Sequence, residues 1–281
     1  MVGRHAPSPT GTMHWGNAST ALLAWLQVRS QAGTLLLRIE DLDPQRSKTE
    51  FAEGWRRDLA WLGLEWDREV PRQSLRGASY QEALEKLQGK NLVFTCQCTR
   101  RDMDEAVTAP QGPRADSYPG TCSDGRWPLG GPGTRRLRFA DNAVVLRRAD
   151  GAWAYQLAVV VDDFDQGVSH IMRGRDLATS QAVQDFMHRE LGNPHTPEVA
   201  LAPLWMGADG HRLSKRHGSV GIRSSGMEAA QALGLLAQGL GLRDRPDACT
   251  PTELIDDWRA RGPASLAKGE VAAANFLPLP L

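Results

Sequence analysis

The first 43 residues contain the pattern that most limits what this chain can fold into. A short N-terminal segment leads into a turn rich in proline and glycine. Residues 16–32 then place leucines at helical spacing before Gly33, a residue type common just after a helix. Residues 34–43, TLLLRIEDLD, open with a continuous apolar run and finish in acids, as a strand buried on both faces does. A strand, a turn, a helix and a second buried strand predict the start of a parallel α/β sheet.

The remaining sequence predicts a continued alternation of helices and strands without an internal repeat. Ser47 and Glu50 are expected to cap the helix that follows the second strand. Residues 109–133 are rich in proline, glycine, aspartate and arginine, have no period, and are interpreted as an irregular insertion. We predict helices over residues 44–64, 79–87, 176–191 and 227–242, strands over residues 92–98, 155–167 and 198–206, and a hairpin over residues 135–148.

The composition excludes several classes of protein. In 281 residues, 33 lysines and arginines balance 33 aspartates and glutamates, so no global positive field drives binding to nucleic acid. A hydrophobic content of 41% is enough for a buried core. Neither an uninterrupted apolar stretch of about 18 residues nor an N-terminal signal sequence is recognisable. We therefore expect a cytoplasmic protein whose cysteines do not form disulfides.

Residues 7–17, PSPTGTMHWGN, combine a sharp turn with the start of a helix. Such a turn directs backbone N–H groups and the positive end of a helix toward one point, which favours an anion. His14 can donate a hydrogen bond to a phosphate there, and Gly16 allows a base or sugar to approach the backbone closely. The alternative is an ordinary turn in which His14 caps the helix.

Residues 211–219, HRLSKRHGS, form a second candidate phosphate site. Cations on both sides of a serine, in a glycine-bounded loop after a strand, are suited to neutralising charge on a polyphosphate. Lys215 is the best candidate for that role. A solvated basic turn is the alternative interpretation of this loop taken alone.

Three cysteines are close in the sequence: Cys96, Cys98 and Cys122. Two are one residue apart and the third follows across the irregular insertion, which predicts a closed structural zinc site that fixes a loop without a hydrophobic core. No histidine lies between His14 and His170 to complete the ligand set. Tyr118 is the nearest oxygen donor with suitable spacing, and Asp116 and Asp124 are rivals. Three incidental thiols without a metal are the other interpretation.

Two of these segments together resemble a known enzyme family. PSPTGTMHWGN and RLSKR resemble, in content and order, the HIGH and KMSKS signatures of class I aminoacyl-tRNA synthetases. GRHAPSPTGTMHWGNA together with RIEDLD is similar to the glutamyl branch, and the resemblance covers residues 3–219. The departures are modest: Trp15 replaces an aliphatic residue, Asn17 the second histidine and Leu213 the methionine. His5 stands where this branch often has an aromatic residue, and no role follows for it.

The resemblance implies roles for single positions of this sequence. ATP is expected to contact His14, Gly16, Asn17, Ser214 and Lys215. All of these except Ser214 are expected to act in catalysis. L-Glutamate is expected to contact Arg4, Ser8, Glu40, Tyr155 and Arg173. Glu40 would hold the α-ammonium group, and an arginine fork suits the side-chain carboxylate. A strand-ending acid and a core tyrosine are the ordinary alternatives for Glu40 and Tyr155.

The resemblance also implies an architecture. The expected fold class is α/β: a Rossmann-like class I synthetase catalytic domain, an inserted zinc-containing subdomain and a short, mainly helical C-terminal region. Residues 1–95 and 151–218 would be the two halves of the catalytic domain, the second half with the KMSKS-like loop. Residues 96–150 would be the zinc or acceptor-type subdomain. Residues 219–281 would form the C-terminal region, which is too short for anticodon-binding domains.

The implied activity is that of a shortened branch of the family, whose zinc site the three cysteines and Tyr118 also resemble. ATP with Mg²⁺ would activate L-glutamate as glutamyl-adenylate, and the glutamyl group would pass to queuosine at the wobble position of tRNA(Asp). A monomer with one structural Zn²⁺ is expected. The alternatives are an enzyme that charges tRNA(Glu) or another acceptor, and a non-catalytic RNA-binding relative that grips RNA with the arginines of residues 135–148.

Overall fold

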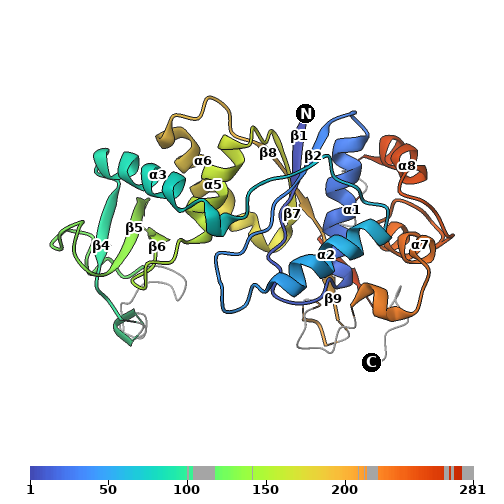
Figure 1. Cartoon of the computed structure of the whole chain (residues 1–281), viewed down its shortest axis with the longest axis horizontal. Helices are drawn as coiled ribbons and strands as arrows, with labels where there is room; N and C mark the ends of the chain where they lie inside the picture. The colour runs from blue at the N-terminus through green and yellow to red at the C-terminus, as the bar shows by residue number, and fades with distance from the viewer. Residues whose placement is uncertain are drawn as a thin grey trace. The chain divides into compact units, whose positions relative to one another are not determined.

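The computed structural model describes residues 1–99, 101–103, 118–140, 142–207, 209–211, 213, 221–262, 266 and 269–273. The chain folds into two compact units (Figure 1). Unit 1 comprises Met1–Arg72, Gln166–Thr179 and Pro197–Leu281, and unit 2 comprises Gln73–Asp165 and Ser180–Thr196. The functional boundaries expected after residues 95, 150 and 218 stay a prediction.

Unit 1 contains a five-stranded parallel sheet, which confirms the α/β prediction. Its strands are β1 (Val2–His5), β2 (Thr34–Leu37), β3 (Arg68–Glu69), β7 (His170–Gly174) and β8 (Glu198–Ala202). Their order is β3-β2-β1-β7-β8, and every neighbouring pair is parallel. The order reverses between β1 and β7. In open α/β sheets, ligands bind outside the carboxyl ends of the strands at such a reversal.

Helix α1 (Trp15–Arg29) connects the proline- and glycine-rich turn to β2. It contacts β1, β2 and β7, and also α8 (Glu253–Arg261). Leu35 and Leu37 belong to the same apolar cluster as α1, whereas Leu36 belongs to a second cluster on the opposite face of the sheet. This burial on both faces explains the continuous apolar run of the second strand.

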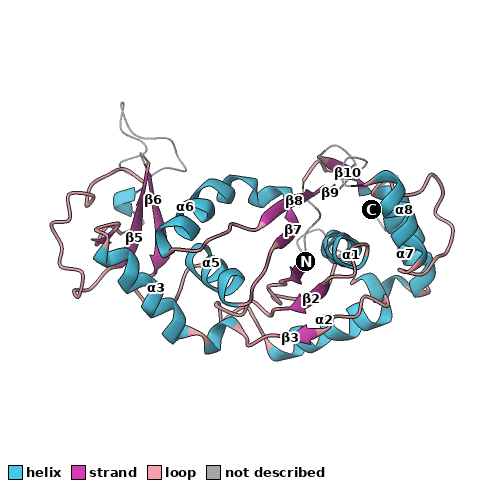
Figure 2. Cartoon of the chain, turned by 90° about the horizontal axis from the view of Figure 1, so that it is seen from above, coloured by secondary structure: helices cyan, strands magenta, loops and turns pink. Residues whose placement is uncertain are grey.

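The C-terminal part of unit 1 adds helices and a small sheet. α7 (Ala229–Gly239) and α8 both lie on the side of α1 that is away from β1, β2 and β7 (Figure 2). The strand expected over residues 198–206 is interrupted at Pro203, because proline cannot donate a ladder hydrogen bond. β8 therefore stays in the large sheet, while β9 (Leu204–Met206) pairs with β10 (Glu270–Ala272). Within the described ranges, none of the helices has the length and apolar character needed to cross a membrane.

Unit 2 combines an antiparallel sheet with helices. The sheet has the order β4-β5-β6, and β5 and β6 confirm the predicted hairpin. Helix α5 contacts α3, α6 and β6. The elements are β4 (Val93–Cys96), β5 (Thr134–Phe139), β6 (Asn142–Arg147), α3 (Gly77–Gly89), α5 (Tyr155–Asp165) and α6 (Gln181–Leu191).

The prediction of a strand over residues 155–167 is wrong, because most of this segment forms α5. Its valines are buried against neighbouring helices, and a short buried run does not distinguish a strand from a buried helix. Asp162, whose side chain is fully buried, accepts hydrogen bonds from Gln73 at 2.7 Å and Tyr80 at 3.0 Å. These contacts connect α5 to the segment around α3 and outweigh the β propensity of valine.

The predicted capping pair of the second helix is also wrong. α2 (Thr49–Trp61) has Lys48 as its N-cap, and no side chain caps it. Ser47 belongs to the preceding turn, where its N–H donates to the carbonyl of Asp43 at 2.8 Å. Glu50 lies in the first turn of α2, where its charge interacts favourably with the positive end of the helix.

Candidate active site

Three of the residues expected to bind glutamate share one face of the parallel sheet. The register pairs Arg4 of β1 with Leu36 of β2 and with Ile171 of β7. Residues two apart along a strand point to the same face, so Glu40 and Arg173 follow on the side of Arg4. All three side chains are buried. The three residues thus lie at or just beyond the carboxyl ends of β1, β2 and β7, beside the point where the strand order reverses.

The backbone stays extended beyond Leu37, the last residue of β2, so successive side chains continue to point to alternate faces of the sheet. The N–H of Arg38 donates to the carbonyl of His5 at 3.0 Å, and the N–H of Glu40 donates to that of Pro7 at 2.9 Å. The guanidinium of Arg38 donates to Glu40 at 3.3 Å and to the side-chain oxygen of Gln166 at 2.9 Å. Sequence reasoning missed Arg38 and Gln166. The spacing of arginine and glutamate in RIEDLD was the available signal for the first of them.

Buried charged side chains gather on this face. Arg4, Arg38 and Arg173 carry buried guanidinium groups, and Glu40 carries a buried carboxylate. Buried charges lose their hydration and are stable only with charged or hydrogen-bonding partners. Such a set suits a ligand that brings two carboxylates and one ammonium group.

Ser8 and Tyr155 occupy different settings. Ser8 is exposed in the turn after β1, where its carbonyl accepts a hydrogen bond from the N–H of Thr10 at 2.8 Å. Tyr155 is the first residue of α5 in unit 2 and is half-buried. Their contacts with glutamate stay predictions.

His14 is the N-cap of α1. Its Nδ1 accepts a hydrogen bond from the backbone N–H of Asn17 at 3.3 Å, and the side-chain oxygen of Asn17 accepts one from the N–H of His14 at 3.3 Å. This reciprocal capping box satisfies two N–H groups at the start of the helix. Because Nδ1 accepts, the neutral imidazole carries its proton on Nε2. Capping through Nδ1 and donation through Nε2 are therefore compatible roles.

Gly16 provides room for the imidazole of His14. A Cβ at this position would lie 3.2 Å from Cε1 and 3.3 Å from Nδ1 of that ring. Alanine would therefore press the ring away from its capping geometry. A direct role of Gly16 and Asn17 toward ATP stays a prediction.

The second candidate phosphate loop is anchored beside the first. Leu213, within the loop, and Ile222, after it, belong to the same buried apolar cluster as Met13. The N–H of Ile222 also donates to the carbonyl of Met13 at 2.9 Å. Met13 directly precedes the N-cap of α1. Ser214 and Lys215 lie outside the described residues.

Three thiols gather in unit 2. The sulfur atoms of Cys96, Cys98 and Cys122 all lie within 4.8 Å of one another, and those of Cys98 and Cys122 are 3.6 Å apart. Around a tetrahedral ion with bonds of about 2.3 Å, thiolates lie about 3.8 Å apart. The cluster can hold a metal ion such as zinc.

Burial and mutual hydrogen bonding set the protonation of these thiols. Burial, followed by hydrogen bonds with the other two thiols, raises the pKa of Cys98 to about 12. Burial also raises the pKa of Cys122, but hydrogen bonds from the backbone of Gln97 and from Cys98 lower it overall below its ordinary value. A bound dication would stabilise all three thiolates and release their protons.

Tyr118 lies beside the thiols. Its hydroxyl oxygen accepts a hydrogen bond from the N–H of Cys122 at 2.8 Å, and burial is the main cause that raises its pKa. Asp124 is instead exposed and forms an ion pair with Arg126 at 2.7 Å. Asp116 lies outside the described residues. Tyr118 therefore fits the fourth ligand position better than Asp124.

The arginines of the basic hairpin make contacts within unit 2. Arg135 donates to two backbone carbonyls, and Arg148 forms an ion pair with Asp150 at 2.7 Å. The other three guanidinium groups lie 4.7 to 4.8 Å from aromatic ring centroids: Arg136 over Tyr118, Arg138 over Phe94 and Arg147 over Trp153. These cation–π contacts stabilise the unit and weaken the interpretation of the hairpin as an open RNA grip.

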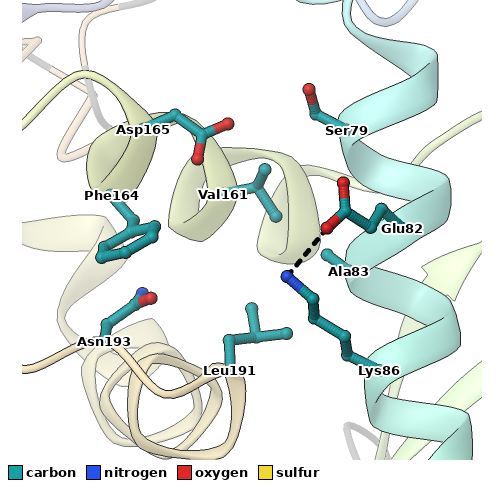
Figure 3. Close-up of a pocket in the computed structure, with 9 residues that line it drawn as sticks. All are labelled: Ser79, Glu82, Ala83, Lys86, Val161, Phe164, Asp165, Leu191 and Asn193. Carbon is teal, nitrogen blue, oxygen red and sulfur yellow. Dashed lines mark ion pairs between the residues drawn. The ribbon is translucent and has the colours of Figure 1, made fainter.

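Unit 2 also has a small hollow between α3, α5 and the end of α6 (Figure 3). Glu82 and Lys86 form an ion pair beside it at 2.9 Å. Its volume is about 90 Å³, whereas ligand pockets typically have roughly 300–1,000 Å³. None of the predicted site residues that the structure describes lines it. The hollow is too small for a nucleotide.

Comparison with known proteins agrees with this architecture. The sequence model of the tRNA synthetases class I (E and Q), catalytic domain, matches residues 1–124 and 135–242. A glutamyl-Q tRNA(Asp) synthetase from Symbiobacterium thermophilum is 40% identical over an alignment of 300 positions that covers 91% of each chain. One from Nocardia farcinica is 42% identical over an alignment of 287 positions that covers 92% of this chain and 89% of the relative.

Solved structures show the same fold. A glutamate tRNA ligase from Elizabethkingia meningosepticum superposes with a TM-score of 0.81 at 22% sequence identity, covering 98% of this chain and 68% of that chain. Fold, motif order and sequence identity agree. The chain therefore belongs to the class I tRNA synthetases (E and Q) and, within them, to the glutamyl-Q tRNA(Asp) synthetase family.

Proposed function

We propose that this protein uses ATP to activate L-glutamate as glutamyl-adenylate and then transfers the glutamyl group to queuosine at the wobble position of tRNA(Asp). The observation that carries the proposal is the buried face shared by Arg4, Glu40 and Arg173 where the strand order reverses. The names of the relatives supply the acceptor.

Glutamate is proposed to bind on this face of the sheet. Glu40 accepts hydrogen bonds from the α-ammonium group, and Arg4 or Arg173 forms a two-pronged contact with the side-chain carboxylate. Ser8 and Tyr155 add hydrogen bonds. A two-pronged guanidinium contact favours the carboxylate of glutamate over an uncharged side chain of similar size.

ATP is proposed to bind at the start of α1. The positive end of the helix attracts phosphate, and Nε2 of His14 donates to it. Gly16 and Asn17 form part of the surface that ATP contacts at the start of the helix, while Ser214 and Lys215 contact the polyphosphate. A glutamate carboxylate oxygen attacks the α-phosphorus and the bond to the bridging oxygen breaks, so pyrophosphate leaves. Lys215 stabilises the charge that grows on pyrophosphate, and Mg²⁺ accompanies ATP.

A structural Zn²⁺ is proposed at the thiol cluster, one per chain. Cys96, Cys98, Tyr118 and Cys122 would hold it and so fix the segment between β4 and β5. With this site, residues 96–150 form a subdomain inserted between the catalytic segments 1–95 and 151–218. Residues 219–281 form the C-terminal region. The protein is proposed to be a monomer and to act in the cytoplasm.

The first test is glutamate-dependent exchange between ATP and labelled pyrophosphate without tRNA. Exchange is expected with glutamate and not with glutamine or aspartate. The Glu40→Gln variant removes the carboxylate proposed to bind the α-ammonium group and keeps the size of the side chain, so its exchange activity should fall. Absence of exchange from well-folded wild-type protein would contradict the proposed activation of glutamate and would favour a non-catalytic RNA-binding protein.

The second test identifies the acceptor. Labelled glutamate is supplied with ATP and with tRNA(Asp) that contains or lacks queuosine, and with tRNA(Glu). Label on queuosine-containing tRNA(Asp) alone is the expected result. Label on tRNA(Glu) would instead identify a shortened enzyme of ordinary charging specificity.

A further inference from the structure

Trp55 connects α2 with the turn in front of α1. Its ring is buried, and its indole N–H donates to the carbonyl of Gly11 at 2.8 Å. Gly11 lies three residues before His14, the N-cap proposed to hold an ATP phosphate. The hydrogen bond therefore ends on the backbone of the turn that places this N-cap.

His5, the last residue of β1, packs against the same indole. The two ring centroids are 5.9 Å apart and the rings are nearly parallel, with 26° between their planes. Nε2 of His5 is buried and has no hydrogen-bond partner among the residues that the structure describes. Burial, and then the charge of Arg4, lowers the pKa of His5 to about 3. The imidazole is therefore neutral and stacks on the indole.

We propose that Trp55 is a positioning residue of the ATP site: it holds residues 11–13, the end of the turn that leads into the N-cap, through the carbonyl of Gly11 and is itself held in place by His5. This inference rests on the proposed binding of ATP at the start of α1. Strand, helix and turn are joined through one indole ring. Displacing the turn therefore breaks a buried hydrogen bond, whose loss leaves a buried carbonyl unsatisfied. His5, to which the sequence assigns no function, acquires one.

Trp25 offers a matched control within the same unit. It is 7% exposed, against 4% for Trp55, and its indole N–H donates to the carbonyl of Glu65 at 3.1 Å. Trp25 lies ten residues along α1 from Trp15, about 15 Å at 1.5 Å per residue. Replacing either tryptophan by phenylalanine removes one indole hydrogen bond to a backbone carbonyl and keeps an aromatic ring.

The experiment compares W55F and W25F in glutamate-dependent exchange. Both variants are expected to melt at lower temperature by similar amounts. W55F is expected to raise the KM for ATP about fivefold, as the loss of one hydrogen bond allows, and to leave the KM for glutamate within about twofold. W25F should leave both KM values within about twofold. Equal KM values for ATP in the two variants, or an equal rise for both substrates in W55F, would overturn the inference.

A second measurement uses the wild-type protein, so it does not depend on how the variants fold. With ¹⁵N-labelled tryptophan, a non-hydrolysable ATP analogue is expected to shift the indole resonance of Trp55 and not that of Trp25. An analogue that saturates its site without shifting the Trp55 resonance overturns the inference. Wild-type protein without exchange activity points instead to failure of the proposed function.

Discussion

Arg38 and Glu40 form an ion pair inside the core of unit 1. Nη2 of the guanidinium lies 3.3 Å from Oε1 of the carboxylate, and the two side chains are 0% and 7% exposed. At this depth neither charge is hydrated, so each depends on charged and hydrogen-bonding neighbours. The pair holds in place the carboxylate proposed to bind the α-ammonium group of glutamate.

Replacing Arg38 by methionine is expected to lower the free energy of unfolding by about 3–5 kcal/mol, because it leaves a buried carboxylate without this cation. Urea denaturation measures the change. Combining Arg38→Met with Glu40→Leu should recover part of the loss, since the carboxylate that Arg38 pairs with is then removed as well. A single variant as stable as the wild type would show that the pair does not stabilise the fold.

The two roles of His14 can be separated by substitution. His14→Ala removes the N-cap and is expected to cost about 1 kcal/mol of stability. His14→Asn supplies another good N-cap and should stay within a few tenths of the wild type. Both variants lack the Nε2 donor, so pyrophosphate exchange should fall by about a hundredfold in each. Full activity of the asparagine variant would limit His14 to capping.

His5 predicts a specific pH dependence of stability. Its folded-state pKa of about 3 lies below the ordinary value of 6.5, so the fold favours the neutral imidazole. The contribution of neutral His5 to the free energy of unfolding is fully present above pH 6.5. It is lost as the pH falls from 6.5 toward 3, by up to about 1.4 kcal/mol per pH unit.

His5→Phe keeps the stack on Trp55 and removes both the titration and the buried ring nitrogen. The variant should therefore be at least as stable as the wild type at pH 7, and its advantage should grow from pH 6 to pH 4 in urea denaturation. An H5F profile parallel to that of the wild type would contradict the burial of a neutral imidazole.

Cys98→Ser is expected to release the zinc and to loosen unit 2 without abolishing adenylate formation. Metal analysis should fall from about one ion per chain to about none, because three-ligand zinc binding is far weaker. Cys249, a buried cysteine of unit 1, provides the control: C249S should retain the metal. An unchanged metal content in C98S would remove Cys98 from the site.

Local pattern was sufficient to predict the elements around the candidate active site. The turn of residues 7–17, the helix after it and the strand before RIEDLD each follow from local propensity and period. The parallel register then places Arg4, Glu40 and Arg173 on one face. The thiol cluster also followed from spacing. Cys96 and Cys98 are one residue apart, so closing the single loop that leads to Cys122 brings all three cysteines together.

The errors arose where packing overrides local preference. Residues 155–167 contain a run of valines typical of a strand, yet most of them form α5. The helix packs against α3, α6 and β6, and its buried Asp162 accepts a hydrogen bond from Gln73. Ser47 had the sequence of a cap, but the turn anchored on Asp43 places the helix start beyond it.

The sequence by itself determined the parallel α/β class, the two phosphate-site motifs, the thiol pattern and the family resemblance, because all of these depend on residue types at short spacing. Only the tertiary structure decided that Arg38 contacts both Glu40 and Gln166, that Trp55 reaches Gly11, and that His5 is neutral. Each of those facts joins residues distant in the chain or depends on burial. Burial is a property of the packed core, and no local stretch of sequence contains it.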